Sequence, residues 1–157
     1  MTPVKLLSSI KPSYIREILN VVASEDIISL AGGLPSPETF PLQMIAEAIP
    51  KMSESSHLFQ YAATAGYQPL IDFIRQQYQV PTTHDVLITT GSQQGIDLCA
   101  KAFLGKGDKV VVESPSYLGA LQIFSIAQAT VLPVQQTFDG PDLAQLEHHF
   151  QAGDVKC

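Results

Sequence analysis

The chain has 157 residues, of which 45% are hydrophobic, so it is long enough for one domain with a core and is not a disordered chain. Its net charge is −6 and it has no Lys/Arg cluster, which argues against nucleic acid or an anionic membrane surface as a partner. Two cysteines, Cys99 and Cys157, indicate a reducing cytoplasm rather than a disulfide framework. The histidines and cysteines lack the spacing of metal ligands, so no metal is expected.

The first 40 residues are predicted to form an N-terminal arm, one helix and one short strand. The apolar spacing of an amphipathic helix occurs at 13–22, and a short apolar strand follows at 27–30. The strand leads into the glycine pair Gly32 and Gly33, which lets the backbone pass close to another group.

Two further helices are predicted before residue 80, separated by a polar loop. The first begins at Pro41 and ends near Met52, and the second covers about 67–79. The side chains predicted to face inward are Leu42, Ile45, Ala46 and Ile49 in the first helix and Leu70, Phe73 and Ile74 in the second.

From residue 85 onward, strands and helices alternate with short connections. The predicted strands are 86–90, 109–113 and 130–134, and the predicted helices are 92–104, 116–127 and 141–151. Alternation of this kind predicts an α/β fold with a parallel sheet and right-handed crossovers. Residues 154–157 look like the opening of one more strand, so we expect a truncation after residue 157. The predicted domains are the N-terminal region at 1–40 and an incomplete large domain at 41–157.

A glycine turn joins the first of these strands to its helix, with the sequence Gly91-Ser92-Gln93-Gln94-Gly95. Such a turn aims backbone N–H groups and the positive end of a helix dipole at one point, which suits a phosphate. The same residues would also serve as an ordinary helix start. The turn is not a P-loop, because no Gly-Lys-Ser/Thr follows, and it lacks the G-x-G-x-x-G spacing of a dinucleotide site.

Four other residues have a functional and a structural interpretation. Tyr117 follows the next strand, where it could stack on an aromatic cofactor or pack on the sheet. Tyr61 lies in the polar loop, where its hydroxyl could reach a phosphate or its ring could anchor local packing. Gly33 could line a substrate pocket or turn a corner, and Arg16 could bind a substrate carboxylate or point into solvent.

Four segments, in this order, resemble the N-terminal part of the fold-type-I, pyridoxal-phosphate-dependent aminotransferases of class I/II. The segments are residues 28–35, residues 59–61 with residues 66–67, residues 87–94 and residues 113–117. They span essentially the whole chain. Within the family, the chain most resembles the branch that includes 2-aminoadipate and related broad-specificity aminotransferases. That branch also resembles the effector domains of MocR-type regulators.

The resemblance implies roles for the residues of the predicted cofactor site. Ser92 and Gln93 would hold the phosphate of pyridoxal phosphate beside Gly91, and Tyr117 would stack on its pyridine ring. Tyr61 would donate its hydroxyl to the phosphate in the partner subunit's site, which implies a homodimer for the full-length protein.

The resemblance also implies residues that contact the substrate, and it places the Schiff-base lysine outside these 157 residues. Gly33 would lie against the substrate carboxylate, and Arg16 would take part in recognising the substrate side chain. The family's Schiff-base lysine would lie beyond Cys157, so no catalytic residue is assigned. None of the chain's own lysines stands where the family places it: Lys5, Lys11, Lys51, Lys101, Lys106, Lys109 and Lys156.

The predicted function is therefore that of part of an aminotransferase, which moves an amino group between an amino acid and a 2-oxo acid. Without the lysine, we expect the 157 residues alone to be inactive and to bind the cofactor weakly and non-covalently. The alternatives are a fragment of a MocR-type effector domain and a relic without function.

Overall fold

The computed structural model describes residues 33–157, which divide into two units at residues 33–88 and 89–157. The predicted helix at 13–22, the predicted strand at 27–30 and Arg16 lie outside the described residues. The predicted domain boundary after residue 40 stays a prediction. Each unit is described here by itself.

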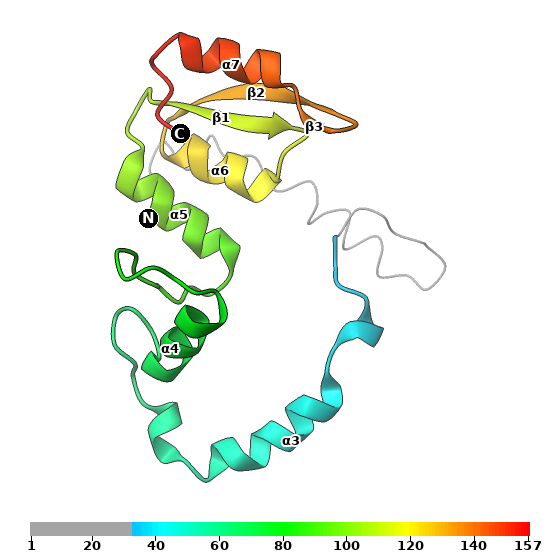
Figure 1. Cartoon of the computed structure of the whole chain (residues 1–157), viewed down its shortest axis with the longest axis vertical. Helices are drawn as coiled ribbons and strands as arrows, with labels where there is room; N and C mark the ends of the chain where they lie inside the picture. Colours follow the sequence, from blue (N-terminus) through cyan, green and yellow to red (C-terminus); the bar gives the residue numbers. More distant parts are fainter. Residues whose placement is uncertain (1–32) are drawn as a thin grey trace, which may run out of the picture. The chain divides into compact units, whose positions relative to one another are not determined.

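Residues 33–88 form short helices joined by loops (Figure 1). The elements in chain order are η1 (Pro37–Thr39), α3 (Leu42–Ser53), η2 (Ser56–Phe59) and α4 (Gln68–Gln77). Proline marks the start of both longer helices: Pro41 immediately precedes α3, and Pro69 lies in the first turn of α4. A proline is tolerated there because the first N–H groups of a helix have no intrahelical partner. Both helices predicted for this part of the chain are confirmed.

The predicted inward face of α3 is wrong for the described residues. Leu42 and Ile49 are 69% and 58% exposed, and Ile45 and Ala46 are exposed as well. The spacing of these residues does produce an apolar helix face, as predicted. Amphipathic spacing determines which face is apolar, but burial requires a second element against that face, and residues 33–88 include none that buries it.

In α4 the buried position also differs from the prediction. Phe73 and Leu70 are 59% and 41% exposed and Ile74 is half-buried, whereas Ile71 is only 4% exposed. Ile71 occupies the same apolar side of the helix, one position after Leu70. Tertiary packing therefore buries one residue of the apolar face, which helical periodicity alone does not specify.

The strand predicted at 86–90 is absent from the described structure. The backbone N–H of Ile88 donates to the carbonyl of Ala65 at 2.9 Å, so this segment contacts a loop rather than a neighbouring strand. Gly66 makes the contact close: its φ is +115°, and a Cβ there would lie 2.6 Å from Cβ and Cγ1 of Ile88. A β-branched sequence favours extended backbone, but a strand also requires a paired partner.

Residues 89–157 form a three-stranded sheet with helices around it (Figure 1). The elements are α5 (Ser92–Phe103), β1 (Lys109–Ser114), α6 (Leu118–Ile126), β2 (Thr130–Thr137), β3 (Gly140–Pro141) and α7 (Leu143–Gln151). Strands β1 and β2 are parallel, with Lys109 opposite Thr130. This arrangement confirms the predicted α/β alternation.

The segment after α7 pairs with the free side of β1. Val155 forms a parallel bridge with Lys109, and the N–H of Lys156 donates to the Lys109 carbonyl at 2.8 Å. The N–H of Val111 donates to the carbonyl of Cys157 at the same distance. The prediction that residues 154–157 begin a further strand is thus supported by a short parallel pairing.

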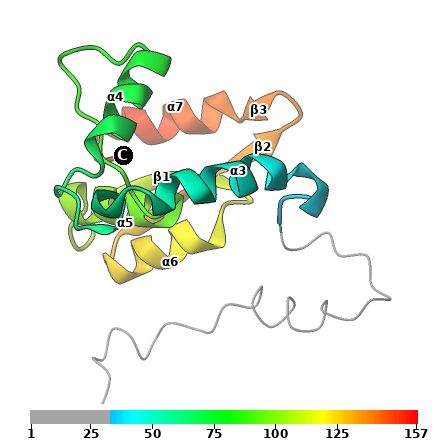
Figure 2. The same ribbon diagram turned by 90° about the horizontal axis from the view of Figure 1, so that it is seen from below.

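Helices α6 and α7 lie on opposite faces of the sheet, as two views at right angles agree (Figures 1 and 2). The chain moves from β1 to β2 in one direction and then returns past β1 to Val155. Since both crossovers connect parallel strands and such crossovers are right-handed, the two connecting helices must lie on opposite faces. The buried apolar residues of this unit are Ala100, Val110, Ala120, Ile123 and Val134.

The helix predicted from residue 141 begins two residues later. Pro141 belongs to β3, which pairs antiparallel with the end of β2 and was not predicted. Asp142 then caps α7, and its carboxylate accepts hydrogen bonds from the N–H groups of Ala144 and Gln145 at 3.0 and 3.1 Å. An aspartate at this position stabilises a helix start through both hydrogen bonding and the helix dipole.

Candidate functional site

The turn predicted to hold a phosphate opens helix α5. Gly91 is its cap residue, with φ +85° and ψ 170°, a conformation that L side chains rarely adopt. Ser92 and Gln93 follow as the first two helical residues. Because glycine has no side chain to cap the helix, no side chain of the described residues caps this first turn, and its N–H groups and the helix dipole favour an anion there.

Gln94 holds the turn in shape. Its side-chain oxygen accepts hydrogen bonds from the N–H of Thr90 at 2.6 Å and from the Thr90 hydroxyl at 2.8 Å. The Thr89 hydroxyl donates to the carbonyl of Gly91 at 3.1 Å. Sequence reasoning named Gln94 in the motif but assigned it no role. A glutamine three residues after a helix cap is the signal that could have identified it, because such residues reach back to the preceding backbone.

Tyr117 lies at the start of the next helix. Strand β1 ends at Ser114, a cis Ser114–Pro115 peptide follows, and Tyr117 is the cap residue of α6 and is 57% exposed. Gln93 connects the two helix starts, since its Nε2 donates to the carbonyl of Gly119 at 3.3 Å. The structure therefore brings three predicted cofactor residues, Ser92, Gln93 and Tyr117, to two neighbouring helix N-termini.

Two other predicted site residues, Tyr61 and Gly33, belong to residues 33–88, whereas Arg16 lies outside the described residues. Tyr61 follows η2 and its side chain is 98% exposed. It lines a pocket of about 550 Å³ whose polar members include His57 and Gln60. Gly33 is exposed, with φ +57°. The roles predicted for Tyr61 and Gly33 stay predictions.

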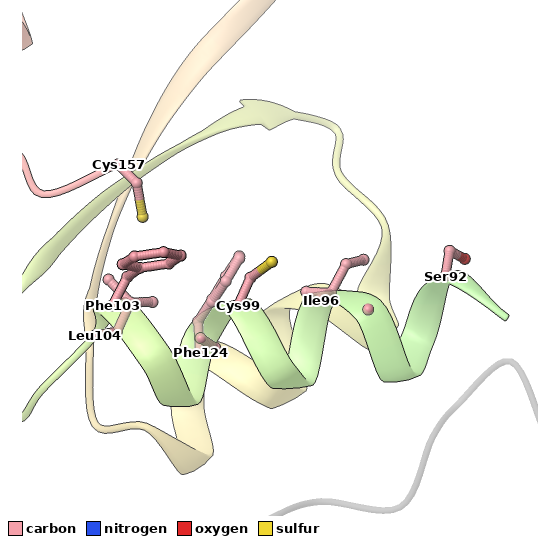
Figure 3. Close-up of a pocket in the computed structure, with 9 residues that line it drawn as sticks. Ser92, Ile96, Cys99, Phe103, Leu104, Phe124 and Cys157 are labelled. Atoms are coloured by element: carbon pink, nitrogen blue, oxygen red, sulfur yellow. The ribbon is translucent and has the colours of Figure 1, made fainter. Parts of the chain in front are cut away.

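A second, apolar groove of about 440 Å³ runs along α5 (Figure 3). Ser92 lies at one end, Cys157 lies at the other, and Cys99 and Phe124 lie between them. Both cysteines are free thiols. The groove provides an apolar surface beside the turn and contributes no charged group to it.

Residues 33–157 lack two further features. No group of three or more His, Cys, Asp or Glu side chains there could hold a metal ion. Within the same residues, every helix is too short or too polar to cross a membrane.

Comparison with known proteins identifies the family. The family model for aminotransferase class I and II matches residues 25–156. The chain belongs to this family. Its fold is that of the fold-type-I enzymes, which depend on pyridoxal phosphate.

Relatives of known name cover nearly all of the chain. A 2-aminoadipate transaminase of Thermus thermophilus is 44% identical over 140 residues, which are 88% of this chain and 35% of the relative. An aromatic-amino-acid aminotransferase of Thermococcus litoralis is 39% identical over 148 residues, 90% of this chain and 36% of the relative. The chain thus spans about a third of the length of the curated relatives it matches.

A solved structure adds a ligand to the comparison. The alpha-aminoadipate aminotransferase of Thermus thermophilus, complexed with N-(5'-phosphopyridoxyl)-L-leucine, is 41% identical and superimposes with a TM-score of 0.81. The match covers 95% of this chain and 37% of that one. The described residues suit such a ligand, because uncapped N–H groups at α5 can donate hydrogen bonds to a phosphate and the exposed ring of Tyr117 can stack on an aromatic face.

Proposed function

We propose that this chain supplies part of the cofactor site of an aminotransferase that transfers an amino group between an amino acid and a 2-oxo acid. Pyridoxal phosphate provides the electron sink for that chemistry. In this proposal the first turn of α5, with Gly91, Ser92 and Gln93, binds the phosphate, and Tyr117 stacks on the ring.

One observation carries the proposal: the side chains of Gln93 and Tyr117 lie against the same backbone position, Gly119. The turn proposed to bind the phosphate and an aromatic ring are thereby next to each other, as a phosphorylated aromatic ligand requires. The open N–H groups of α5 supply the hydrogen bonds and the dipole for a dianion, while the ring supplies a contact that does not depend on charge.

Further parts of the proposal concern the whole protein. Tyr61 would reach the cofactor phosphate of the partner subunit, which requires a homodimer, and its exposed side chain is available for such a contact. Gly33 and Arg16 would face the substrate, and the protein would act in the cytoplasm. The inactivity of these 157 residues by themselves stays a prediction.

The experiment is a calorimetric titration of the chain with pyridoxamine phosphate, which has the phosphate and the ring but no aldehyde to react with surface lysines. Tyr117→Ala should weaken binding about three- to tenfold, the scale of a lost aromatic contact. The matched control is Tyr78→Ala, which removes a more exposed tyrosine after α4 and should leave the affinity unchanged. Equal affinities of all three proteins would refute the assignment of Tyr117.

A further inference from the structure

Gly119, in the first turn of α6, stands where two predicted cofactor residues meet. The Gln93 side chain, 26 residues away, donates its Nε2 to the Gly119 carbonyl. A Cβ built on Gly119 would overlap Oε1 of Gln93 and would lie 2.6 and 2.7 Å from Cζ and Cε1 of Tyr117. Real Cβ atoms do not approach other atoms so closely, so a side chain at this position requires Gln93 and Tyr117 to move.

Backbone conformation does not explain this glycine. Gly119 lies within α6 and does not have the positive φ of Gly33 or Gly91, so its backbone suits any L residue. Alanine is more favourable than glycine inside a helix, because glycine loses more conformational freedom on folding. Local propensity therefore favours a larger residue, whereas the Gln93 and Tyr117 side chains already occupy the space that its Cβ would need.

We propose that Gly119 is a positioning residue for the cofactor: its missing side chain leaves the space in which the Tyr117 ring and the Gln93 amide lie. The inference rests on the function proposed above. Gln93 belongs to the turn assigned to the phosphate, and Tyr117 is assigned to the ring. Gly119 therefore positions the side chains of both residues from one place without touching the cofactor.

The contacted atoms explain what a substitution would do. Oε1 of Gln93 and Cζ of Tyr117 are at the far ends of exposed side chains, which can rotate away from an added methyl group if the hydrogen bond from Gln93 to Gly119 breaks. Gly119→Ala should therefore leave the helix folded and displace the two side chains. The loss should appear in ligand affinity rather than in stability, which distinguishes positioning from a structural role.

The test compares the chain with Gly119→Ala in the same pyridoxamine phosphate titration, with folding monitored by circular dichroism. The control is Gly105→Ala, after the far end of α5, where a Cβ would lie at an ordinary 3.5 Å from Asp108 Oδ2. We expect about tenfold weaker binding for Gly119→Ala, and unchanged binding for Gly105→Ala. Unchanged affinity in Gly119→Ala, or its unfolding, would overturn the inference.

A double substitution tests whether Gly119 acts through the ring. In a Tyr117→Ala background, Gly119→Ala should weaken binding by clearly less than it does in the wild-type chain, because part of what it displaces is already gone. Fully additive effects would overturn the positioning role. A wild-type chain that does not bind pyridoxamine phosphate would instead refute the proposed function, and the inference with it.

Discussion

Replacing Gly66 with alanine should destabilise residues 33–88 through two separate effects. Gly66 has φ +115°, which costs an L residue about 1–2 kcal/mol. A Cβ there would also lie 2.6 Å from Cβ and Cγ1 of Ile88. These atoms belong to the stem of a β-branched side chain that cannot rotate away, so the overlap should add about 1–3 kcal/mol.

Gly107→Ala separates the two effects. Gly107 also has a positive φ, +87°, but nothing lies within 4 Å of its would-be Cβ, so only the backbone cost applies. In urea unfolding followed by circular dichroism, we expect Gly66→Ala to lose about 3 kcal/mol and Gly107→Ala about 1 kcal/mol.

The difference between the two variants measures the contact between Gly66 and Ile88. A Gly66→Ala/Ile88→Ala double variant should be less destabilised than the sum of its single substitutions, because the smaller residue makes room for the added methyl group. Equal losses in Gly66→Ala and Gly107→Ala would refute the reasoning, since they would mean that the close approach has no energetic consequence.

Two further substitutions test the packing of residues 89–157. Asp142→Ala removes the cap of α7 and should lower the free energy of unfolding by about 1 kcal/mol. Its control, Asp139→Ala, removes the same charge from the exposed turn before α7 and should change the free energy of unfolding by less than about 0.5 kcal/mol. Val134 is 1% exposed, so Val134→Ala should cost about 2 kcal/mol and the half-buried Val131→Ala clearly less; equal losses would contradict the assigned core.

The chain's own sequence predicted the regular elements well wherever neighbouring residues decide the structure. Apolar periodicity and turn residues identified α5, β1, α6 and β2, because helix and strand periods are local properties of the chain. The turn at Gly91 was predicted for the same reason, because a glycine with positive φ and the helix start after it involve only consecutive residues.

Pairing and burial were predicted less well, because both depend on residues distant in the chain. Residues 86–90 have a strand composition, but the N–H of Ile88 bonds to a loop carbonyl instead of a neighbouring strand. The apolar face of α3 has the periodicity of a buried surface, yet Leu42 and Ile49 are exposed because no element of residues 33–88 covers them.

The candidate site divides in the same way. Ser92, Gln93 and Tyr117 could be named from the sequence, because each stands in a short motif at the end of a predicted strand. Their relation to Gly119 could not, since Gln93 reaches it across 26 residues. The sequence by itself determined the family, the element types and the chemistry of the turn. Only the tertiary structure decided which side chains share one space, because that depends on how separate helices pack.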